Sequence, residues 1–564
     1  MSAENGKPMK HIIDQATFDE AVNENIEILD MLSDEAIEAA KAQFLSQNVD
    51  LSNIITDAYL YDGIDNHPFV KKFNKCKELA KEIIIDEDEI MSLIHGIVKE
   101  METDKAKKLY VGNNGGYTLG VDILRAIAEQ ADPNPSRKFK KNLELLEQLE
   151  LVMIIFLKKI LNGYPDLLNP KDVPVFLNIM EKHVTHKREY TSDVFIQMIL
   201  ELISNTLVLH ENNRELWMRT SLLDSLSILV PYKYYPTLVR ILKLFRALSL
   251  DDDIRVEVPN THERVRQLSD RFLAPLTNML GEVDAMTSAD NLQTSHADRV
   301  ESHAEKIPSH ADKISSHADK IPSHADKVTS HADKIAFTVQ LLRTVACLCV
   351  RNEHCACVAD NGGVRYVQEL LRAELTRILE GHLTGDTVEL VNASMTLVKT
   401  IAGNDDVKNA LYESGLVEII VEIVNAIDER KGKLKDQSGV CIQLNESFLL
   451  LLATLTLRHP GIVSKLLDYS ILDTILNLVK QHSANIKIVK YAAWNIRNIC
   501  VRNRTAAETA CGLGAVELLE ECLKVHPSVA FDVKNAMKEL GDDVKVDLVE
   551  QWTGKGECNF NPEF

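Results

Sequence analysis

Residues 397–420 read LVKTIAGNDDVKNALYESGLVEII, and this stretch sets the fold that we expect for the chain. An apolar run ends at Ala402, a polar break follows at Asn404, and a second apolar run begins after Gly415. The break residue lies eleven positions before the glycine. Glycine tolerates the positive φ angle of a tight turn, so the pattern predicts helices joined by short, fixed connections.

The same frame recurs along the chain. Three further break residues precede a small residue by eleven positions: Asn352 with Gly363, His459 with Ser470, and Asn503 with Gly514. Successive copies are 44 to 55 positions apart, which fits helical repeats of about 40–47 residues with loop insertions. Weaker copies at His210 and Lys105 extend the pattern upstream, to about eight repeats between residues 70 and 530. Such repeats are expected to stack, because one alone cannot cover its own apolar face.

The overall composition fits a helical array and disfavours several other classes of protein. Hydrophobic residues make up 45% of the 564 residues but aromatic residues only 5%, as in helices packed by aliphatic side chains. The net charge of −21 disfavours nucleic acid and anionic membranes as partners. It suits basic peptides or basic protein surfaces, and it suits solubility equally well.

The cellular location is expected to be the cytoplasm, with the nucleus left open. The first residues lack the apolar core of a signal peptide, and the longest apolar candidate for a membrane span, 149–160, is interrupted by charged residues. The ten cysteines show no regular framework, so free thiols are predicted.

The repeats resemble the armadillo repeat, a three-helix unit with a polar break and a glycine. Four stretches carry a closer resemblance to the group of armadillo repeat-containing protein 6: residues 17–26 with 49–54, 251–256, 401–408 and 552–554. The resemblance implies an all-α fold, an armadillo-type right-handed α-solenoid used for protein binding. It also implies a protein without catalytic residues, so we expect neither an enzyme nor a need for a cofactor or metal.

Five segments are expected along the chain: N-terminal amphipathic helices at 1–65, degenerate armadillo repeats at 66–282, a low-complexity histidine-heptad insertion at 283–335, well-formed armadillo repeats at 336–530, and a C-terminal capping helix with a tail at 531–564. In the first segment Phe18, Val22, Ile26 and Leu29 recur at helical spacing. These helices are interpreted either as a cap on the first repeat or as a partner-binding arm, and the cap is favoured.

The insertion contains six heptads, each with one histidine: His296, His303, His310, His317, His324 and His331. Pro308 and Pro322 interrupt any continuous helix, so a solvated, disordered or frayed tract is predicted. Metal binding is the first alternative, although residues seven apart lie about 10.5 Å apart along one helix and could not share an ion. A pH switch near the histidine pKa of about 6.5 is the second.

A cysteine-rich stretch superficially resembles a zinc site. It contains Cys347, Cys349, Cys355 and Cys357, with His354 between them. One residue separates the cysteines of each pair, whereas zinc fingers have two to four. Buried cysteines at helix contacts are therefore the preferred interpretation.

The third helix of an armadillo repeat lines the concave groove, so the resemblance places the partner-binding residues there. Counting back from each break residue gives the candidates Asn205, Arg246, Arg343, Lys399, Thr454, Trp494 and Asn498. Trp494 and Asn498 resemble the pair with which importin-type arrays hold an extended basic peptide. Because only one repeat has both residues, binding of nuclear localisation signals is not expected, and a packing role for Trp494 stays open.

The leading functional hypothesis is a non-enzymatic scaffold or adaptor that holds a partner protein or extended peptide on the concave face. The alternative is a structural assembly factor that joins larger complexes through its flanks and its insertion. The sequence does not identify the partner, and neither nucleic acid nor a membrane is expected to be one.

Overall fold

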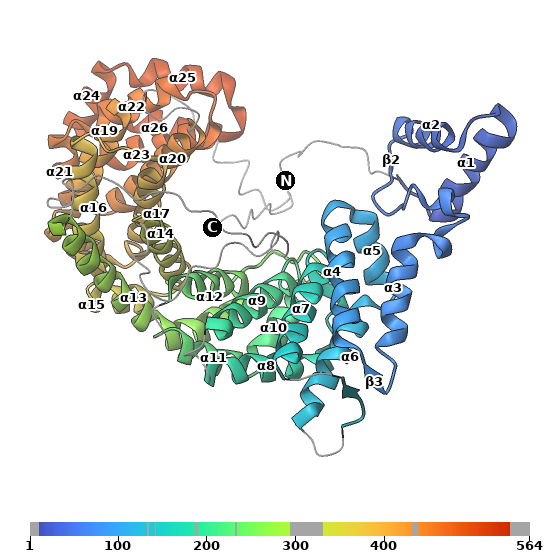
Figure 1. Cartoon of the computed structure of the whole chain (residues 1–564). Coiled ribbons are helices and arrows are strands. Elements are labelled where there is room, and N and C mark those ends of the chain that lie inside the picture. The colour runs from blue at the N-terminus through green and yellow to red at the C-terminus, as the bar shows by residue number, and fades with distance from the viewer. Residues whose placement is uncertain are drawn as a thin grey trace, which may run out of the picture. The chain divides into compact units, whose positions relative to one another are not determined.

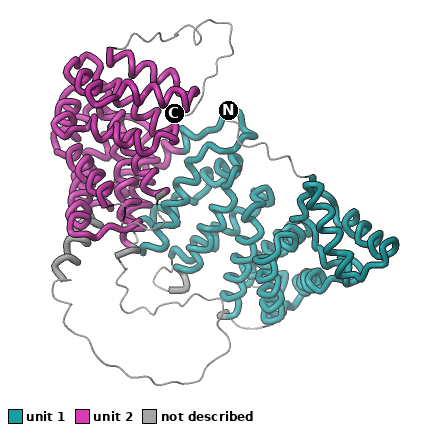
Figure 2. The backbone as a smooth tube through the Cα atoms, turned by 90° about the horizontal axis from the view of Figure 1, so that it is seen from above, with its two compact units in different colours: residues 1–264 teal, residues 265–564 magenta. Residues whose placement is uncertain are grey.

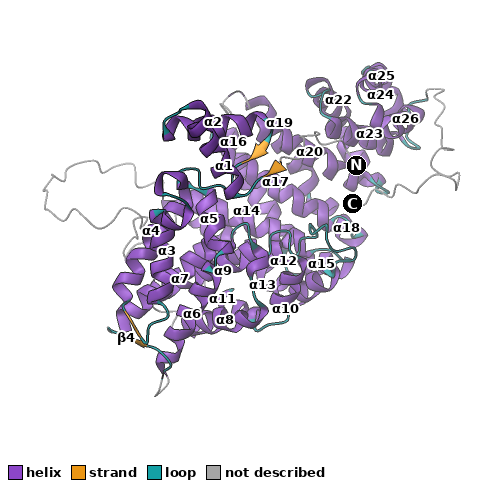
Figure 3. Cartoon of the chain, turned by 90° about the vertical axis from the view of Figure 1, so that its right-hand side faces the viewer, coloured by secondary structure: helices purple, strands orange, loops and turns teal. Residues whose placement is uncertain are grey.

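The computed structural model describes residues 11–131, 135–140, 143–185, 190–231, 234–293, 331–430, 432 and 438–541. These residues form 26 α-helices, several 3₁₀ turns and four strands of two residues each (Figures 1 and 3). The strands pair in parallel: β1 (His11–Ile12) with β2 (Val49–Asp50), and β3 (Ile84–Ile85) with β4 (Lys138–Phe139). The expected all-helical fold is therefore confirmed for the described residues, and none of their strands lies between 337 and 540.

The helices form two compact units, residues 1–264 and residues 265–564 (Figure 2). The boundary falls near the start of α13 (Thr261–Gln293), at Arg264. Counted from α5 to α26, the described helices make eight successive repeats, and two of these lack a first α-helix.

In unit 2 the third helices of successive repeats pack side by side. They are α14 (His331–Leu348), α17 (Gly385–Ile401), α20 (Ser438–Thr456), α23 (Ile486–Cys500) and α26 (Ala530–Glu539). The first helices are α15 (Asn352–Asp360), α18 (Asp405–Ser414), α21 (Pro460–Asp468) and α24 (Arg504–Gly512). The second helices are α16 (Gly363–Leu379), α19 (Leu416–Arg430), α22 (Ile471–Gln481) and α25 (Ala515–Val525). Figure 1 shows α14 and α17 on the opposite side of the unit from α15, α16, α19 and α21.

Unit 1 is built in the same way. Its third helices are α4 (Glu87–Thr103), α7 (Leu143–Leu161), α9 (Tyr190–Thr206) and α12 (Tyr235–Leu248), each packed on the next. The other helices of its repeats are α3 (Pro68–Leu79), α5 (Lys105–Asn113), α6 (Gly116–Ala128), α8 (Val173–Thr185), α10 (Glu211–Met218) and α11 (Leu222–Leu229). Two 3₁₀ turns, η4 (Pro165–Leu167) and η5 (Pro170–Asp172), replace the first helix ahead of α8.

The eleven-residue spacing has a direct structural cause. Asn404 is the N-cap of α18, where its side chain accepts two backbone hydrogen bonds, and Gly415 ends that helix with a φ of 77°. The same pair of roles recurs at His459 with Ser470, and at Asn503 with Gly514. A first helix of nine or ten residues thus fits between its cap and a left-handed residue. In two repeats the N-cap and the left-handed glycine lie one position earlier than the sequence pattern predicted. They are Arg351 with Gly362, and Asp104 with Gly115.

In four repeats, one position of the first helix joins that helix to the third helix of the same repeat, and the sequence pattern did not predict this contact. The fourth residue after the N-cap donates to a carbonyl at the C-terminal end of the following third helix. The contacts are Arg214 Nε to Ala247 O at 3.1 Å, Lys408 Nζ to Leu457 O at 3.2 Å, Cys355 Sγ to Thr400 O at 3.6 Å, and Lys108 Nζ to Asn162 O. The last carbonyls of a helix have no partner within it, so these side chains satisfy groups that would otherwise be left open.

The two expected N-terminal helices are present as α1 (Gln15–Leu29) and α2 (Ser33–Ser46). They bury Phe18, Val22 and Phe44 in a core of their own, whereas Leu29 is 57% exposed. Contact with the repeats comes from the segment that follows, because Ile55 and Ala58 pack on Ala106 of α5. The apolar faces of the two helices are therefore directed toward each other.

Several expected features fall wholly or partly outside the described residues. Residues 294–330 hold the first five of the six predicted histidines. Both ends of the expected insertion are helical, because α13 runs to Gln293 and α14 begins at His331. At the other end of the chain, the expected capping helix corresponds to α26, and residues 542–564 with Trp552 lie outside the described part.

One described helix is long and apolar enough to cross a membrane by length and composition. It is the stretch Gly439–Thr456 of α20, with a mean hydropathy of 1.4. Half of this stretch is buried, and α20 packs between α17 and α23. The stretch predicted as the longest apolar candidate was 149–160, so the sequence pattern missed this longer one. The position of α20 is that of a core helix in a stacked array.

Candidate functional site

All seven predicted partner-binding residues lie on third helices and are half-buried. They are Asn205 on α9, Arg246 on α12, Arg343 on α14, Lys399 on α17, Thr454 on α20, and Trp494 and Asn498 on α23. They form two groups, one in each unit. A half-buried side chain is held in place by its neighbours and can still reach a ligand. The sequence frame therefore selected the intended helix in each of the six repeats for which it gave a candidate.

Trp494 connects α23 to the last third helix. Its indole Nε1 donates to Asp532 Oδ1 of α26 at 2.8 Å. The Tyr491 ring lies 5.4 Å away between centroids, and Lys490 Nζ lies 5.2 Å from the centroid of the Trp494 ring. The polar edge of Trp494 thus serves packing between helices, which was one of the two roles left open, while part of its side chain stays accessible.

Asn498 also bonds to a neighbouring helix. Its Nδ2 donates to Ala453 O at 3.0 Å and to Thr456 Oγ1 at 3.4 Å, both in α20. Asn205 occupies the equivalent position of its repeat and donates to Lys158 O of α7 at 3.0 Å. The amide nitrogen with which importin-type arrays hold a peptide is therefore engaged with the preceding third helix in both places.

Lys399 differs from the other candidates because no contact within the described part of the protein accounts for its partly buried charge. The side chain is half-buried on α17 and has no hydrogen-bond or ion-pair partner among the residues that the structure describes. Burial lowers the pKa of Lys399. Removing an ammonium group from water without a partner costs free energy, and such groups are concentrated at functional sites.

The contacts of Arg343 and Thr454 are weaker evidence for a binding role. Arg343 Nη1 forms an ion pair with Glu389 Oε1 at 3.0 Å, which connects α14 to α17. Both side chains are more than one-third exposed, so the pair adds little stability. Thr454 Oγ1 donates to Leu450 O of its own helix at 3.0 Å. Both residues stay available to a ligand on the third-helix side of unit 2.

Three third helices of unit 1, α7, α9 and α12, line a polar groove, and Asn205 is the one predicted candidate among its lining residues. This basic groove has a volume of about 480 Å³ and is lined by Lys158, Lys159, Asn162, Glu201, Ser204, Asn205, Val239, Arg240 and Lys243. Glu201 lies between two cations, with Lys158 Nζ at 2.8 Å and Arg240 Nε at 2.6 Å. Burial raises the pKa of Glu201, but the hydrogen bonds from Lys158 and Arg240 outweigh burial, so the net shift is downward.

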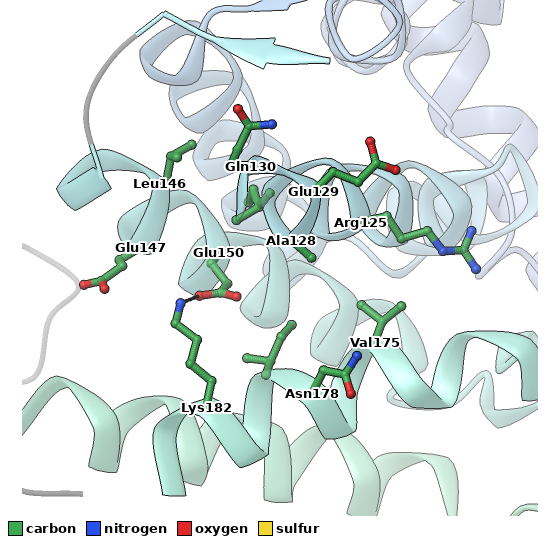
Figure 4. A pocket seen from close by; sticks show the side chains of 12 residues that line it. Arg125, Ala128, Glu129, Gln130, Leu146, Glu147, Glu150, Val175, Asn178 and Lys182 are labelled. Carbon is green, nitrogen blue, oxygen red and sulfur yellow. Dashed lines mark hydrogen bonds and ion pairs between the residues drawn. The ribbon is translucent and has the colours of Figure 1, made fainter. Parts of the chain in front are cut away.

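A second cavity lies on the second-helix side of unit 1, between α6, α7 and α8 (Figure 4). It measures about 610 Å³, and the buried Glu150 forms an ion pair with Lys182 at 3.0 Å on its wall. Burial raises the pKa of Glu150, but the hydrogen bonds and positive charges of His183 and Lys182 outweigh burial, so the net shift is downward. The lining residues include no Ser, Thr, Cys or His.

The cysteines of the predicted cluster lie at helix contacts. Cys349 and Cys355 are buried, whereas Cys347 and Cys357 are half-buried. Cys355 faces Thr400 O of the next third helix, as described above. Within the described ranges no three His, Cys, Asp or Glu side chains lie close enough to hold a metal ion. The structure thus gives Cys349 and Cys355 a packing role.

Comparison with known proteins identifies relatives over most of the chain. The N-terminal domain model of armadillo repeat-containing protein 6 matches residues 10–81. The armadillo repeat-containing protein 6 homolog of Drosophila melanogaster is 26% identical over 418 residues, which cover 74% of this chain and 73% of the relative. Armadillo repeat-containing protein 6 of Homo sapiens is 23% identical over 414 residues, with 72% and 69% covered.

Two solved structures are also similar. An engineered protein aligns with 84% of this chain and 99% of its own, with a TM-score of 0.43 and 12% identity. A designed armadillo repeat protein in complex with peptide (KR)4 aligns with 56% of this chain and 99% of its own, with a TM-score of 0.35 and 16% identity. Neither likeness is close enough to support a conclusion about function.

Proposed function

Because this chain is a distant relative of armadillo repeat-containing protein 6 and carries the N-terminal domain of that family, we propose that it is a non-enzymatic protein-binding scaffold. It holds a partner protein or an extended peptide on the third-helix side of its repeats. Its place of action is the cytoplasm. A stacked array suits this task, because it presents equivalent side chains at regular intervals along a surface.

The observation that carries this proposal is Lys399. Its half-buried ammonium group has no partner in the described part of the chain, although a methionine of similar length would fill the same space at a lower cost. A partner that brings a carboxylate or a carbonyl oxygen to Lys399 supplies the missing contact. The role of Lys399 is therefore to bind a partner, because its charge does not stabilise the fold.

Replacing Lys399 with methionine is expected to move stability and binding in opposite directions. The free energy of unfolding of the surrounding repeats rises by about 0.5–1 kcal/mol, because an unpaired buried charge is lost. Affinity capture followed by mass spectrometry recovers less of the partner, since its contact to the ammonium group is gone. Thermal unfolding and capture are measured on the same full-length protein.

The matched control is Lys480→Met, at an exposed lysine on α22 away from the third helices. Its partner recovery and its unfolding temperature stay near those of the unchanged protein. A Lys399→Met protein that keeps all its partners and loses stability would show that Lys399 belongs to the core. Alanine at Trp494 or Asn498 is a poorer test, because both side chains join helices.

A second candidate function, assembly of larger complexes through the flanks, is favoured by one observation. The corner between α1 and α2 exposes three apolar side chains: Ile28 at 75%, Leu29 at 57% and Leu32 at 72%. Adjacent exposed apolar residues often mark a contact surface. If the flanks make the functional contact, the proteins captured by Lys399→Met are the same as those captured by the unchanged chain.

A further inference from the structure

The basic groove of unit 1 has the opposite charge to the chain as a whole. Four of its lining residues are basic: Lys158, Lys159, Arg240 and Lys243. One lining residue, Glu201, is acidic, while the whole chain carries a net charge of −21. The positive charge comes from two third helices, α7 and α12, which both pack on α9, the helix that carries Glu201.

The carboxylates of the protein neutralise these cations only in part. Glu201 is shared by Lys158 and Arg240, so one negative charge serves two positive ones. Lys159 has its own partner in Glu102, at 2.6 Å. Lys243 is exposed on α12 and has no partner among the described residues. Positive charge therefore remains in excess at this surface.

The neighbourhood of the groove shows the same excess. Lys108 donates to Asn162 O, and Asn162 lines the groove. Burial lowers the pKa of Lys108, and the nearby positive charges of Lys159 and Lys105 lower it further. Cations that repel one another in this way would be stabilised by a bound anion.

We propose that the basic groove binds an acidic segment of a partner protein, in an extended conformation. Aspartate or glutamate side chains of that segment pair with Lys243 and Arg240 at one end and with Lys159 at the other. This inference rests on the proposed scaffold function and specifies the chemistry of the partner. It reverses the expectation of a basic partner, which followed from the net charge of the whole chain.

The groove suits a peptide better than a nucleic acid. Its lining contains no aromatic side chain on which a base could stack. A short acidic peptide responds mainly to local charge, because the Debye length at physiological salt is about 8 Å.

The length of the segment follows from the packing of the helices. Neighbouring helix axes are about 8–10 Å apart, so three third helices span roughly 20 Å. An extended chain covers about 3.3 Å per residue, so about six residues cross the groove. With alternating side-chain direction, about three of them face the protein, which matches the basic residues at the two ends.

The test uses the full-length protein and fluorescein-labelled peptides of about twelve residues, long enough to extend past the groove. An alternating Glu–Ser peptide is expected to bind, whereas alternating Gln–Ser and Lys–Ser peptides are not. Lys243→Glu is expected to weaken binding of the Glu–Ser peptide about five- to tenfold at low salt, because an attractive contact becomes repulsive. Fluorescence anisotropy gives the affinity, which falls as salt is added.

The matched control is Lys171→Glu, at an exposed lysine in η5 that does not line the groove. It makes the same change in net charge and is expected to leave the affinity unchanged. Equal weakening by both variants, equal binding of the Gln–Ser peptide, or tighter binding of a single-stranded oligothymidylate would each overturn the proposal. If the Glu–Ser peptide fails while partner capture still depends on Lys399, the scaffold function stands and only the acidic segment is wrong.

Discussion

Replacing Arg264 with alanine lowers the free energy of local unfolding at the end of unit 1 by about 3–5 kcal/mol, as expected when a buried ion pair loses one partner. The Arg264 side chain is almost fully buried. Its Nε donates to Leu248 O at 2.9 Å and its Nη2 to Leu250 O at 3.1 Å, at the C-terminal end of α12. Its Nη1 contacts the carboxylates of Glu211 and Glu215 in α10. The variant leaves these acceptors unpaired.

This effect is large because every hydrogen-bond donor of the Arg264 guanidinium group has an acceptor. A further bond runs from Nη2 to Thr261 Oγ1 at 3.2 Å, so all five N–H groups have acceptors. Arg264→Lys keeps the charge but lacks the planar fork, and it is expected to recover only part of the loss. The residue thus fixes α10 and the end of a third helix in one geometry.

Hydrogen exchange measures this prediction region by region, which suits a repeat protein that need not unfold in one step. Amides of α10 and α12 exchange faster in Arg264→Ala. The control is Arg219→Ala, because Arg219 is 77% exposed and also forms an ion pair with Glu215, at 3.3 Å. Exchange in the control stays close to that of the unchanged protein. Unchanged exchange in Arg264→Ala would show that the network does not hold the two helices together.

Trp217→Ala is the second large effect, with an expected loss of about 3–5 kcal/mol in the stability of the same repeat. Trp217 is completely buried in α10, and its Nε1 donates to Thr206 Oγ1 of α9 at 2.9 Å. The substitution removes a large apolar side chain and leaves a cavity. It also removes the hydrogen bond that joins a first helix to the end of a third helix.

Trp217→Phe separates the two contributions. It keeps most of the apolar volume and loses the indole N–H, so about 1–2 kcal/mol of the loss is expected to remain. Thermal unfolding and hydrogen exchange of the α9 and α10 amides rank the unchanged protein, Trp217→Phe and Trp217→Ala by stability. A Phe variant as unstable as the Ala variant would contradict the assignment of most of the effect to cavity formation.

The sequence predicted the local parts of the fold because their causes are local. Asn404 and Gly415 fix one first helix by capping and by a left-handed turn, and both effects act within a few residues. The same holds for α1 and α2, whose helical spacing was correctly identified. The strands β1 to β4 were not expected, because pairs of two residues leave no periodic signal.

The contacts between separate helices could not be predicted, because they join residues far apart in sequence. Asp253, for example, accepts a hydrogen bond from the start of α10. The donor is the N–H of Glu211, 42 positions earlier. The basic residue at a fixed place in α5, α10 and α18 was visible in the sequence, and its repetition is the signal that could have identified the contacts between the first and third helices of a repeat.

In the candidate site, too, the local features were predicted and the contacts between distant residues were not. The repeat frame placed all seven predicted residues on third helices, but it gave no information on which hydrogen bonds they make. The amide nitrogens of Asn205 and Asn498 are engaged with neighbouring helices, whereas Lys399 is not. The basic groove could not be predicted from the net charge of the chain, because a sum over all residues carries no information about where the charges lie.

Site-specific photo-crosslinking in cells tests the central claim, that the partner lies on the third-helix side, most directly. A photoreactive residue is placed at Arg343 or Thr454 on third helices, and at Leu379 or Tyr469 on the other side of unit 2; the latter two are 56% and 39% exposed. The account predicts that one and the same protein is crosslinked from both third-helix positions and from neither of the others. Crosslinks to that protein from Leu379 and Tyr469, with none from Arg343 and Thr454, would contradict it.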